Sequence, residues 1–245
     1  MRPRHLRLLL ALTLLVGVVA PGRAEPARPA PPTAPTWSND FTARLEALAV
    51  LQTLNAELLA ASSATLTLDH WCNVHHLASP AKVIAARDLA VNKPAGVDQR
   101  SVLAVGPDEP VRYRRVRLMC GARVLSEADN WYVPGRLTPE INRQLDTSDI
   151  AFGRAAQPLH FQRRTLAARL LWSPLPDGWD VQPVALPDAD ARALAIPHAV
   201  LEHQAVLVLP DGTPISTVIE TYTAQVLGFP QPRPPTLTRA DARHE

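Results

Sequence analysis

The feature that most constrains the fold is a pair of strand-like segments near the end of the chain, joined by a tight turn. Residues 199–209 and 215–222 are rich in β-branched and apolar residues, and Pro210-Asp211-Gly212-Thr213 lies between them. An Asp-Gly pair suits a reversal between antiparallel strands because glycine accepts a positive φ. The pattern therefore predicts a β-hairpin, which a parallel sheet would not contain.

The middle of the chain shows a second pattern of the same kind. Apolar residues are interleaved with arginines over 111–120, and a second strand-like segment follows over 124–133. Gly121-Ala122 suits the turn between them, so we expect a second hairpin. Residues 158–171 have the composition of a further strand, although a helix over 165–171 is an alternative.

Helical periodicity is concentrated toward the front of the chain. Apolar residues recur at helical spacing over 40–61, and Leu68 to His76 fit a second short helix that Thr65 or Thr67 would cap. Thr138-Pro139 opens a helix that runs toward Leu145, whereas residues 92–99 have the composition of a loop. Helices followed by hairpin-linked strands predict an α+β fold with an antiparallel sheet.

The first 24 residues have the three parts of a secretory signal peptide. A basic start precedes 13 uncharged residues, Leu8 to Ala20, and a small-residue exit at Gly22-Arg23-Ala24. Because a membrane span needs about 20 apolar residues, we expect cleavage and no stable membrane insertion; an uncleaved anchor and a misassigned start are the alternatives. The predicted location is periplasmic or secreted.

Proline content marks the limits of the folded part. Residues 25–36 form a proline-rich tether that cannot build a core, and residues 230–245 are predicted to be a disordered tail. We therefore expect one domain over 37–229, a size typical of a single domain.

The charge of the expected mature chain differs from that of the whole sequence. The whole chain has 25 basic and 23 acidic side chains. The signal segment has no acid and holds four of the basic side chains, Arg2, Arg4, Arg7 and Arg23. The remaining 21 basic and 23 acidic side chains give a net charge of −2. This balance gives no reason to expect a nucleic-acid partner.

The two cysteines leave two interpretations open. In an oxidising compartment Cys72 and Cys120 can close a 48-residue loop as a disulfide, and free buried cysteines are the alternative. Cys72 and His75 also have a spacing that can share a metal, but core packing explains them more simply, so we predict no metal site. The sequence has no Gly-rich phosphate loop and no His-Glu-x-x-His or Gly-x-Ser-x-Gly motif.

Charged residues on two of the predicted strands stand out. Alternation places Arg115 and Arg117 on one strand face with Val111 and Tyr113, and it places Glu220 on an apolar face of the last strand. A carboxylate in such a place needs a partner because burying a charge is costly. An arginine and a glutamate that face one enclosed space would suit a small acid and an acid–base step. An ordinary Arg–Glu pair across the sheet is the structural alternative.

The order of these segments resembles chorismate lyase (chorismate–pyruvate lyase) and its relatives. The segment 115–134 begins with an arginine-bearing strand, turns through a hairpin and ends in Val133-Pro134. A Gly-Arg loop at 147–154 and a final hairpin that ends in Ile219-Glu220-Thr-Tyr222 follow. The likeness covers roughly residues 110–222. It implies a single antiparallel β-sheet flanked by helices with an enclosed ligand cavity, no cofactor and no metal.

The resemblance also implies roles for individual residues. Arg115 would hold the ring carboxylate, the backbone at Phe152 and Gly153 would meet the aromatic product, and Glu220 would be the catalytic acid–base group. The function so implied is an exported protein that cleaves chorismate, or a related enolpyruvyl compound, to pyruvate and 4-hydroxybenzoate.

Two alternatives to an enzyme stay open. The chain can be a non-catalytic binding protein for a small anionic aromatic acid on the same fold, or a structural protein whose Arg115–Glu220 pair ties the sheet together. Both ligand hypotheses require that Arg115 and Glu220 face the same cavity.

Overall fold

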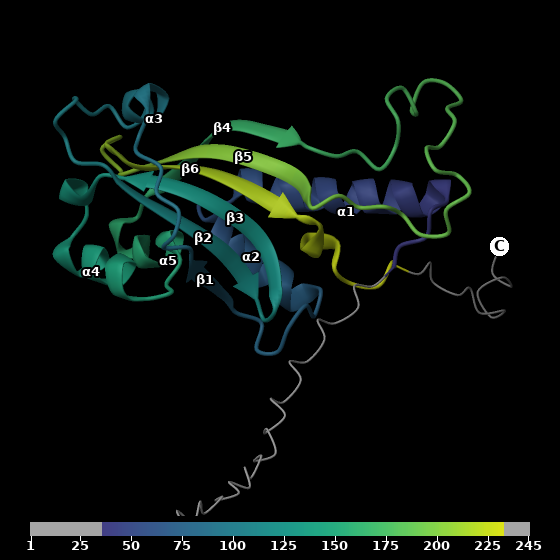
Figure 1. The fold of residues 1–245 in the computed structure, drawn as a ribbon, viewed down its shortest axis with the longest axis horizontal. Helices are drawn as coiled ribbons and strands as arrows, with labels where there is room; N and C mark the ends of the chain where they lie inside the picture. The colour runs from purple at the N-terminus through teal and green to yellow at the C-terminus, as the bar shows by residue number, and fades with distance from the viewer. Residues whose placement is uncertain (1–35, 233–245) are drawn as a thin grey trace, which may run out of the picture. The chain divides into compact units, whose positions relative to one another are not determined.

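The computed structural model describes residues 36–232, and these contain one six-stranded antiparallel sheet flanked by helices (Figure 1). The strands lie in the order β1 (Val83–Arg87), β2 (Arg112–Cys120), β3 (Arg123–Tyr132), β6 (Pro214–Thr223), β5 (Ala199–Val208) and β4 (Gln162–Leu170). The helices are α1 (Phe41–Ala60), α2 (Ala64–Val74), α3 (Val97–Val102), α4 (Pro139–Thr147) and α5 (Phe152–Ala155). Short 3₁₀ turns cover Pro134–Arg136, Gln157–Leu159 and Ala224–Leu227. The predicted α+β class with a single antiparallel sheet is confirmed.

Several expectations concern parts of the chain outside residues 36–232. The signal peptide (1–24), nearly all of the tether (25–36) and most of the tail (230–245) lie outside the described residues. Among the residues that are described, no helix has the length and apolar character needed to cross a membrane.

Both predicted hairpins are present and they form the centre of the sheet. β5 and β6 reverse at Gly212, whose φ of +88° is the conformation that favours glycine, and β2 and β3 reverse at Gly121 with φ of +58°. The hairpins meet where β3 pairs with β6, from Ser126 opposite Tyr222 to Tyr132 opposite Ser216. Antiparallel pairing of two hairpins therefore builds the centre of the sheet, and the chain passes from β3 to β4 at the far edge through α4 and α5.

Helix α1 begins and packs as its sequence predicts. The Asp40 carboxylate accepts a hydrogen bond from the Ala43 amide at 2.9 Å, which caps the helix. Leu51, Leu54 and Leu58 are fully buried on the sheet side of the helix. Burial of each leucine stabilises the fold by roughly 1.5–3 kcal/mol.

Three local expectations need correction. Ser63 occupies the N-cap position of α2 without a side-chain capping bond, in place of Thr65 or Thr67, so the helix starts earlier than predicted and ends before His75. The loop expected over 92–99 ends earlier than predicted, because α3 begins at Val97. Residues 158–161 precede β4, which is a strand throughout 162–170, so the helical alternative over 165–171 is wrong.

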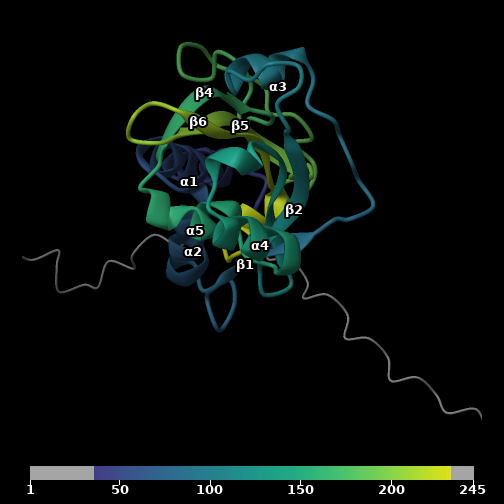
Figure 2. The same cartoon turned by 90° about the vertical axis from the view of Figure 1, so that its left-hand side faces the viewer.

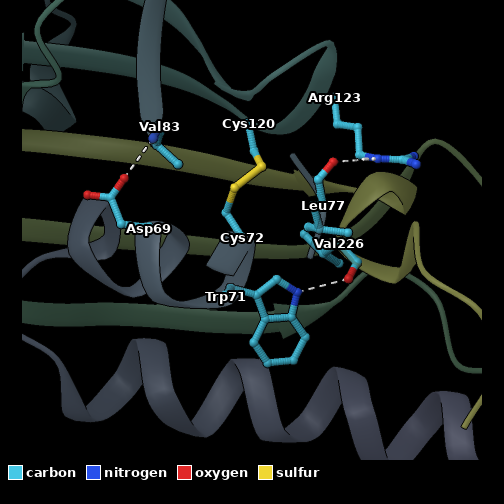
Figure 3. Close-up of a disulfide and its surroundings, with 8 residues drawn as sticks. All are labelled: Asp69, Trp71, Cys72, Leu77, Val83, Cys120, Arg123 and Val226. Atoms are coloured by element: carbon cyan, nitrogen blue, oxygen red, sulfur yellow. Dashed lines mark hydrogen bonds between the residues drawn. A yellow bond between two sulfur atoms is a disulfide. The ribbon is translucent and has the colours of Figure 1, made fainter. Parts of the chain in front are cut away.

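The two cysteines form a disulfide that joins α2 to the end of β2 (Figure 3). The Cα atoms of Cys72 and Cys120 lie 6.2 Å apart, a separation within the range of disulfides. On either side of the bridge, Asp69 accepts a hydrogen bond from the Val83 amide at 2.6 Å and Trp71 donates one to the Val226 carbonyl at 2.9 Å. Covalent and polar contacts therefore hold helix α2 against β1, β2 and the 3₁₀ turn Ala224–Leu227.

The sheet has an inner and an outer face. It curves around α1 and α2, which lie on the inner side (Figure 2). The inner side chains of β2, β3 and β6 join the leucines of α1 in the main hydrophobic core. The outer face has a smaller apolar cluster around Leu103, Trp131 and Val133, beside α3. Which face a strand residue occupies therefore decides whether it meets the core or the surface.

Candidate ligand-binding cavity

A cavity lies between the inner face of the sheet, the start of α2 and α5. Its apolar wall consists of Val116, Leu118, Phe152, Phe161, Leu207 and Val218, among smaller residues. Its polar groups come from Ser63, Thr65, Arg114, Asn130, Arg163 and Glu220. A mostly apolar space with a few convergent polar groups is the usual form of a small-molecule site.

The cavity is compact in this conformation. Its volume is about 40 Å³. This is more than the roughly 10–15 Å³ that one water molecule needs and less than the ~150 Å³ of a cavity that binds benzene. A surface depression beside it, lined in part by Leu66 and His160, shares Ser63, Gly153 and Phe161 with the cavity. Phe161, Ser63 and Gly153 therefore lie between the cavity and this depression.

Of the two arginines that line the cavity, Arg163 is paired with Glu220, whereas Arg114 forms no ion pair with a carboxylate of the described residues. Arg114 is 7% exposed, and its Nη2 donates to the carbonyl oxygens of Ser148 and Ile150 at 3.2 and 2.9 Å. Nε has no hydrogen-bond partner among the described residues, and no carboxylate of residues 36–232 forms an ion pair with the side chain. Burial and the nearby charge of Arg87 lower the pKa of Arg114 to about 10. The guanidinium is thus still a cation at neutral pH. The charges of Asp149 and Asp146 partly offset the lowering of its pKa, but neither carboxylate forms an ion pair with it.

The prediction that Arg115 faces the same cavity as Glu220 is wrong. Arg115 lies on the outer face of β2, where it donates to Asp129 at 2.8 Å and to Glu127 at 3.1 Å. Its hydrogen bond with Asp129 raises the pKa of Arg115 against the opposing effect of burial. Both ligand hypotheses required Arg115 to face the same cavity as Glu220, and it does not. The neighbouring Arg114 lines the cavity instead.

Glu220 lines the cavity as expected, but its ion-pair partner is Arg163 on β4. Arg163 Nη2 donates to Glu220 Oε2 at 2.6 Å, with side chains that are only 2% and 8% exposed. The Tyr222 hydroxyl donates to the same oxygen at 3.2 Å. Both bonds go to Oε2, so Oε1 has no protein donor among the described residues. An ionised carboxylate in this arrangement can accept a further hydrogen bond from a ligand.

The ion pair sets the protonation of the groups around it. Burial alone would lower the pKa of Arg163, but the charge and hydrogen bond of Glu220 together with Tyr222 outweigh it, and the net shift is upward. Burial, followed by the Glu220 charge, raises the pKa of Tyr222 well above its ordinary value, so its hydroxyl keeps the proton it donates. His203 lies beside Glu220 on β5, and burial together with the Arg163 charge lowers its pKa to about 4.

Phe152 and Gly153 lie in the cavity wall, as the sequence predicts. Both belong to α5, and Gly153 faces the first turn of α2. A Cβ atom at Gly153 would lie 2.7 Å from the Ser63 hydroxyl oxygen and 3.3 Å from that of Thr65. A side chain at this position would therefore push into the two hydroxyl groups, so glycine lets α5 approach α2 closely.

The arrangement can bind an acid at one end and a hydrogen-bond donor at the other. Arg114 on β2 stands directly opposite Asn130 on β3, and a carboxylate between them can accept bonds from both side chains. Glu220 is on β6, two strand spacings or roughly 10 Å from β2. The apolar wall between these ends suits a ring or another unsaturated body.

The sequence contained a signal for Arg114 that the alternation argument did not use. Val116, Leu118 and Cys120 share the parity of Arg114 and form the more apolar set on this strand, which identifies their face as the inner one. The roles of Arg163, Asn130 and Ser63 carry no comparable signal. They depend on pairing with β4 and β6 and on the packing of α2.

Comparison with known proteins gives one clear relative. No family model matches this chain. The uncharacterized protein y4mC of Sinorhizobium fredii is 57% identical over 197 residues, which cover 80% of this chain and 83% of that protein.

Solved structures with a similar arrangement are more distant. The effector domain of PhnF from Mycobacterium smegmatis has a TM-score of 0.41 at 13% identity, covering 67% of this chain and 90% of that one. The possible transcriptional regulator YydK from Bacillus subtilis has a TM-score of 0.35 at 15% identity, covering 64% and 62%. A GntR-family transcriptional regulator from Enterococcus faecalis has a TM-score of 0.34 at 10% identity, covering 64% and 96%. Similarity at this level assigns neither a ligand nor an activity to this chain.

Proposed function

We infer that this chain, which belongs to the family of the Sinorhizobium fredii protein y4mC, binds a small carboxylic acid in the cavity between Arg114 and Glu220. The observation that carries this proposal is that Arg114, a buried cation whose hydrogen bonds go to backbone carbonyls and which forms no ion pair with a carboxylate of residues 36–232, lines the cavity. An uncompensated buried charge costs several kcal/mol. A ligand carboxylate would remove that cost and form paired hydrogen bonds with the guanidinium.

The rest of the ligand follows from the other walls of the cavity. Phe152, Phe161 and Val218 favour a flat apolar body, and Glu220 favours a hydroxyl group that donates to its free oxygen. A hydroxylated aromatic acid such as 4-hydroxybenzoate, or an enolpyruvyl acid of similar size, meets these conditions. The order of segments that resembles chorismate lyase supports the same class of ligand.

Titration calorimetry with 4-hydroxybenzoate tests the proposal, and the chain supplies a matched pair of variants. Arg114→Met should weaken binding by about 10- to 100-fold, the scale of a lost hydrogen bond to a charged group. Arg115→Met removes the same group from the outer face of the same strand and should leave binding unchanged. Equal effects of the two variants, or no binding to the wild type, would overturn the proposal. Thermal unfolding and Arg114→Lys separate a binding defect from a folding defect.

Catalysis is the second candidate, and the position of Glu220 in the cavity favours it. A lyase of the chorismate type breaks the bond between a ring carbon and the ether oxygen. It also removes a proton from the hydroxyl-bearing ring carbon and delivers one to the enolpyruvate carbon, which gives pyruvate. Glu220 would carry out these proton transfers. Incubation with chorismate should then release 4-hydroxybenzoate, and Glu220→Gln should lower turnover by about 100-fold. The absence of product would leave the chain as a binding protein.

The proposed location is the periplasm or the exterior of the cell. The signal-like segment over 1–24 supports it, and so does the Cys72–Cys120 disulfide, because such bonds persist in oxidising compartments. Mass spectrometry of protein from the cell envelope should find a mature chain that begins near Glu25. A soluble cytoplasmic protein that retains residues 1–24 would contradict export.

A further inference from the structure

Helix α1 has an exposed face that the proposed binding of an acid does not use. Its buried leucines pack in the main core, and the opposite side of such a helix normally carries charged residues. None of the nine exposed residues of α1, a helix that lies wholly within the described part of the chain, is charged. These residues are Phe41, Thr42, Leu45, Ala49, Gln52, Thr53, Ala56, Leu59 and Ala60. A continuous face of this kind marks an interaction surface, whereas single exposed apolar side chains do not.

The exposed residues have the spacing of a helix that pairs with another helix. Six of them recur at alternating intervals of three and four residues, and we call these the α1 stripe: Thr42, Leu45, Ala49, Gln52, Ala56 and Leu59. This interval keeps the side chains on one face along the whole helix, which is about 30 Å long. Leu45 and Leu59 are 37% and 49% exposed, so both have apolar area left to bury. The α1 stripe therefore suits a partner that is itself a long helix.

The order of side-chain sizes in the α1 stripe is the same in both directions around Gln52. The neighbours of Gln52 in the stripe are Ala49 and Ala56, and the next ones outward are Leu45 and Leu59. A two-fold axis beside Gln52 would place Leu45 of one copy against Leu59 of the other, and the alanines would let the two helix axes approach closely. A symmetric dimer needs a patch that is complementary to itself in this way.

Gln52 has the hydrogen-bonding capacity that a residue on such an axis needs. Its Oε1 accepts a hydrogen bond from Asn55 Nδ2 at 3.0 Å, which orients the side-chain amide. The Nε2 group can then donate to the second lone pair of the same oxygen in the other copy. The polar residue at the centre of the α1 stripe is thus compatible with burial between two copies.

The charges around the α1 stripe favour a second copy of the chain over a membrane surface. A charge on a two-fold axis would meet its own image, so a neutral centre is what self-association requires. Helices that lie on membranes usually have Lys or Arg beside the apolar face. Helix α1 has no lysine, its Arg44 is buried, and the half-buried residues that flank the stripe include the acids Glu46 and Glu57.

We propose that two copies of this chain associate through antiparallel pairing of their α1 stripes. Leu45 of each copy packs against Leu59 of the other, and the two Gln52 side chains meet at the axis. Phe41 extends the apolar surface onto Trp179, whose ring centroid lies 6.2 Å away. One helix pair is small beside the roughly 800 Å² that each partner buries in a standard complex, so the dimer dissociates on dilution. This proposal does not depend on the identity of the ligand.

Sedimentation velocity tests the dimer with two variants that add the same charge. The purified wild-type protein should shift from monomer to dimer between about 1 and 100 μM, the range of weak reversible complexes. Ala56→Glu places two like charges near the axis and should raise the dissociation constant at least about 100-fold. Ala168→Glu, at an exposed position of the edge strand β4, should leave association unchanged. Equal thermal unfolding midpoints would show that both variants fold.

Cysteine crosslinking tests the direction of pairing without a disruptive charge. Gln52→Cys puts a thiol beside the axis, so mild oxidation should convert most of the protein to covalent dimers. Ala60→Cys is exposed at the end of the same helix. In an antiparallel pair this thiol lies roughly 24 Å along the helix from its own copy, so it should crosslink little. Equal crosslinking of the two variants would contradict the antiparallel arrangement.

A protein that stays monomeric at 100 μM would overturn the proposal, and two measurements would then identify another occupant of the α1 stripe. Co-sedimentation with vesicles of phosphatidylethanolamine and phosphatidylglycerol that Ala56→Glu abolishes would make the stripe a membrane contact. Faster proteolysis of residues 1–35 or 233–245 in Ala56→Glu would assign it to the chain's own ends. Neither result bears on the proposed function, because no residue of the α1 stripe lines the cavity.

Discussion

Arg114 and Arg115 are neighbours in the chain, but their electrostatic environments are opposite. Arg115 donates to Asp129 and Glu127 on the outer face of the sheet, so its charge is compensated by the protein. Arg114 donates to two backbone carbonyls and forms no ion pair with a carboxylate of the described residues, although it is buried in the cavity wall. A buried cation without an ion-pair partner lowers the free energy of unfolding, and a bound ligand carboxylate would remove that cost.

At the scale of a single residue, we predict that His203 makes the stability of the folded protein depend on pH. Its pKa in the folded protein is about 4, because of burial and the Arg163 charge, and an unfolded histidine titrates near 6.5. Between these values the unfolded chain binds the proton and the folded chain does not, so stability is complete above about pH 6.5 and falls as the pH drops toward 4. The loss should be on the order of 3 kcal/mol at pH 4.

Urea unfolding at several pH values between 7 and 4 measures this loss. His203→Gln should remove the portion of the pH dependence that belongs to this residue, whereas His198→Gln, at a largely exposed position, should not. If the His203 variant lost stability with falling pH as steeply as the wild type, another group would have to be responsible.

At the scale of elements, strand and helix identities were predictable because they depend on local patterns. The hairpin turns at Gly121 and Gly212 and the first long helix all lie where the sequence places them. The face of β2 was not predictable from alternation alone, because alternation gives the parity of a strand and not the side that helices cover. β1 was missed for a related reason. It has five residues, and its strand character depends on pairing with β2.

The disulfide is the element-scale contact with the clearest expected cost. Closing a 48-residue loop stabilises the folded state by about 4 kcal/mol in the chain-entropy description, and measured values are commonly 2–4 kcal/mol. The Cys72→Ala/Cys120→Ala double variant should therefore lose roughly 2–4 kcal/mol in chemical unfolding. It should also bind the acid more weakly, because the bridge fixes α2, whose first turn lines the cavity. Unchanged stability under non-reducing conditions would mean that the bond does not form.

At the scale of the whole molecule, a sheet curved around two helices leaves one interior space that reaches from β2 to β4. Arg114, Glu220 and Ser63 come from three separate parts of the chain. The first two meet because hairpins β2–β3 and β5–β6 pair side by side, and Ser63 joins them through the packing of α2. The sequence could indicate Glu220, Phe152 and Gly153 as site residues through a resemblance. It could not indicate Arg163, because the approach of β4 to β6 is a long-range consequence of the sheet order.

The most direct test of the central claim is a crystal structure of the protein grown or soaked with 4-hydroxybenzoate. We predict density for the acid inside the cavity, with its carboxylate within hydrogen-bond distance of the Arg114 guanidinium, its hydroxyl directed at Glu220 and Phe161 moved to admit the ring. An empty cavity at saturating ligand, or an acid bound on the outer face beside Arg115, would contradict the account.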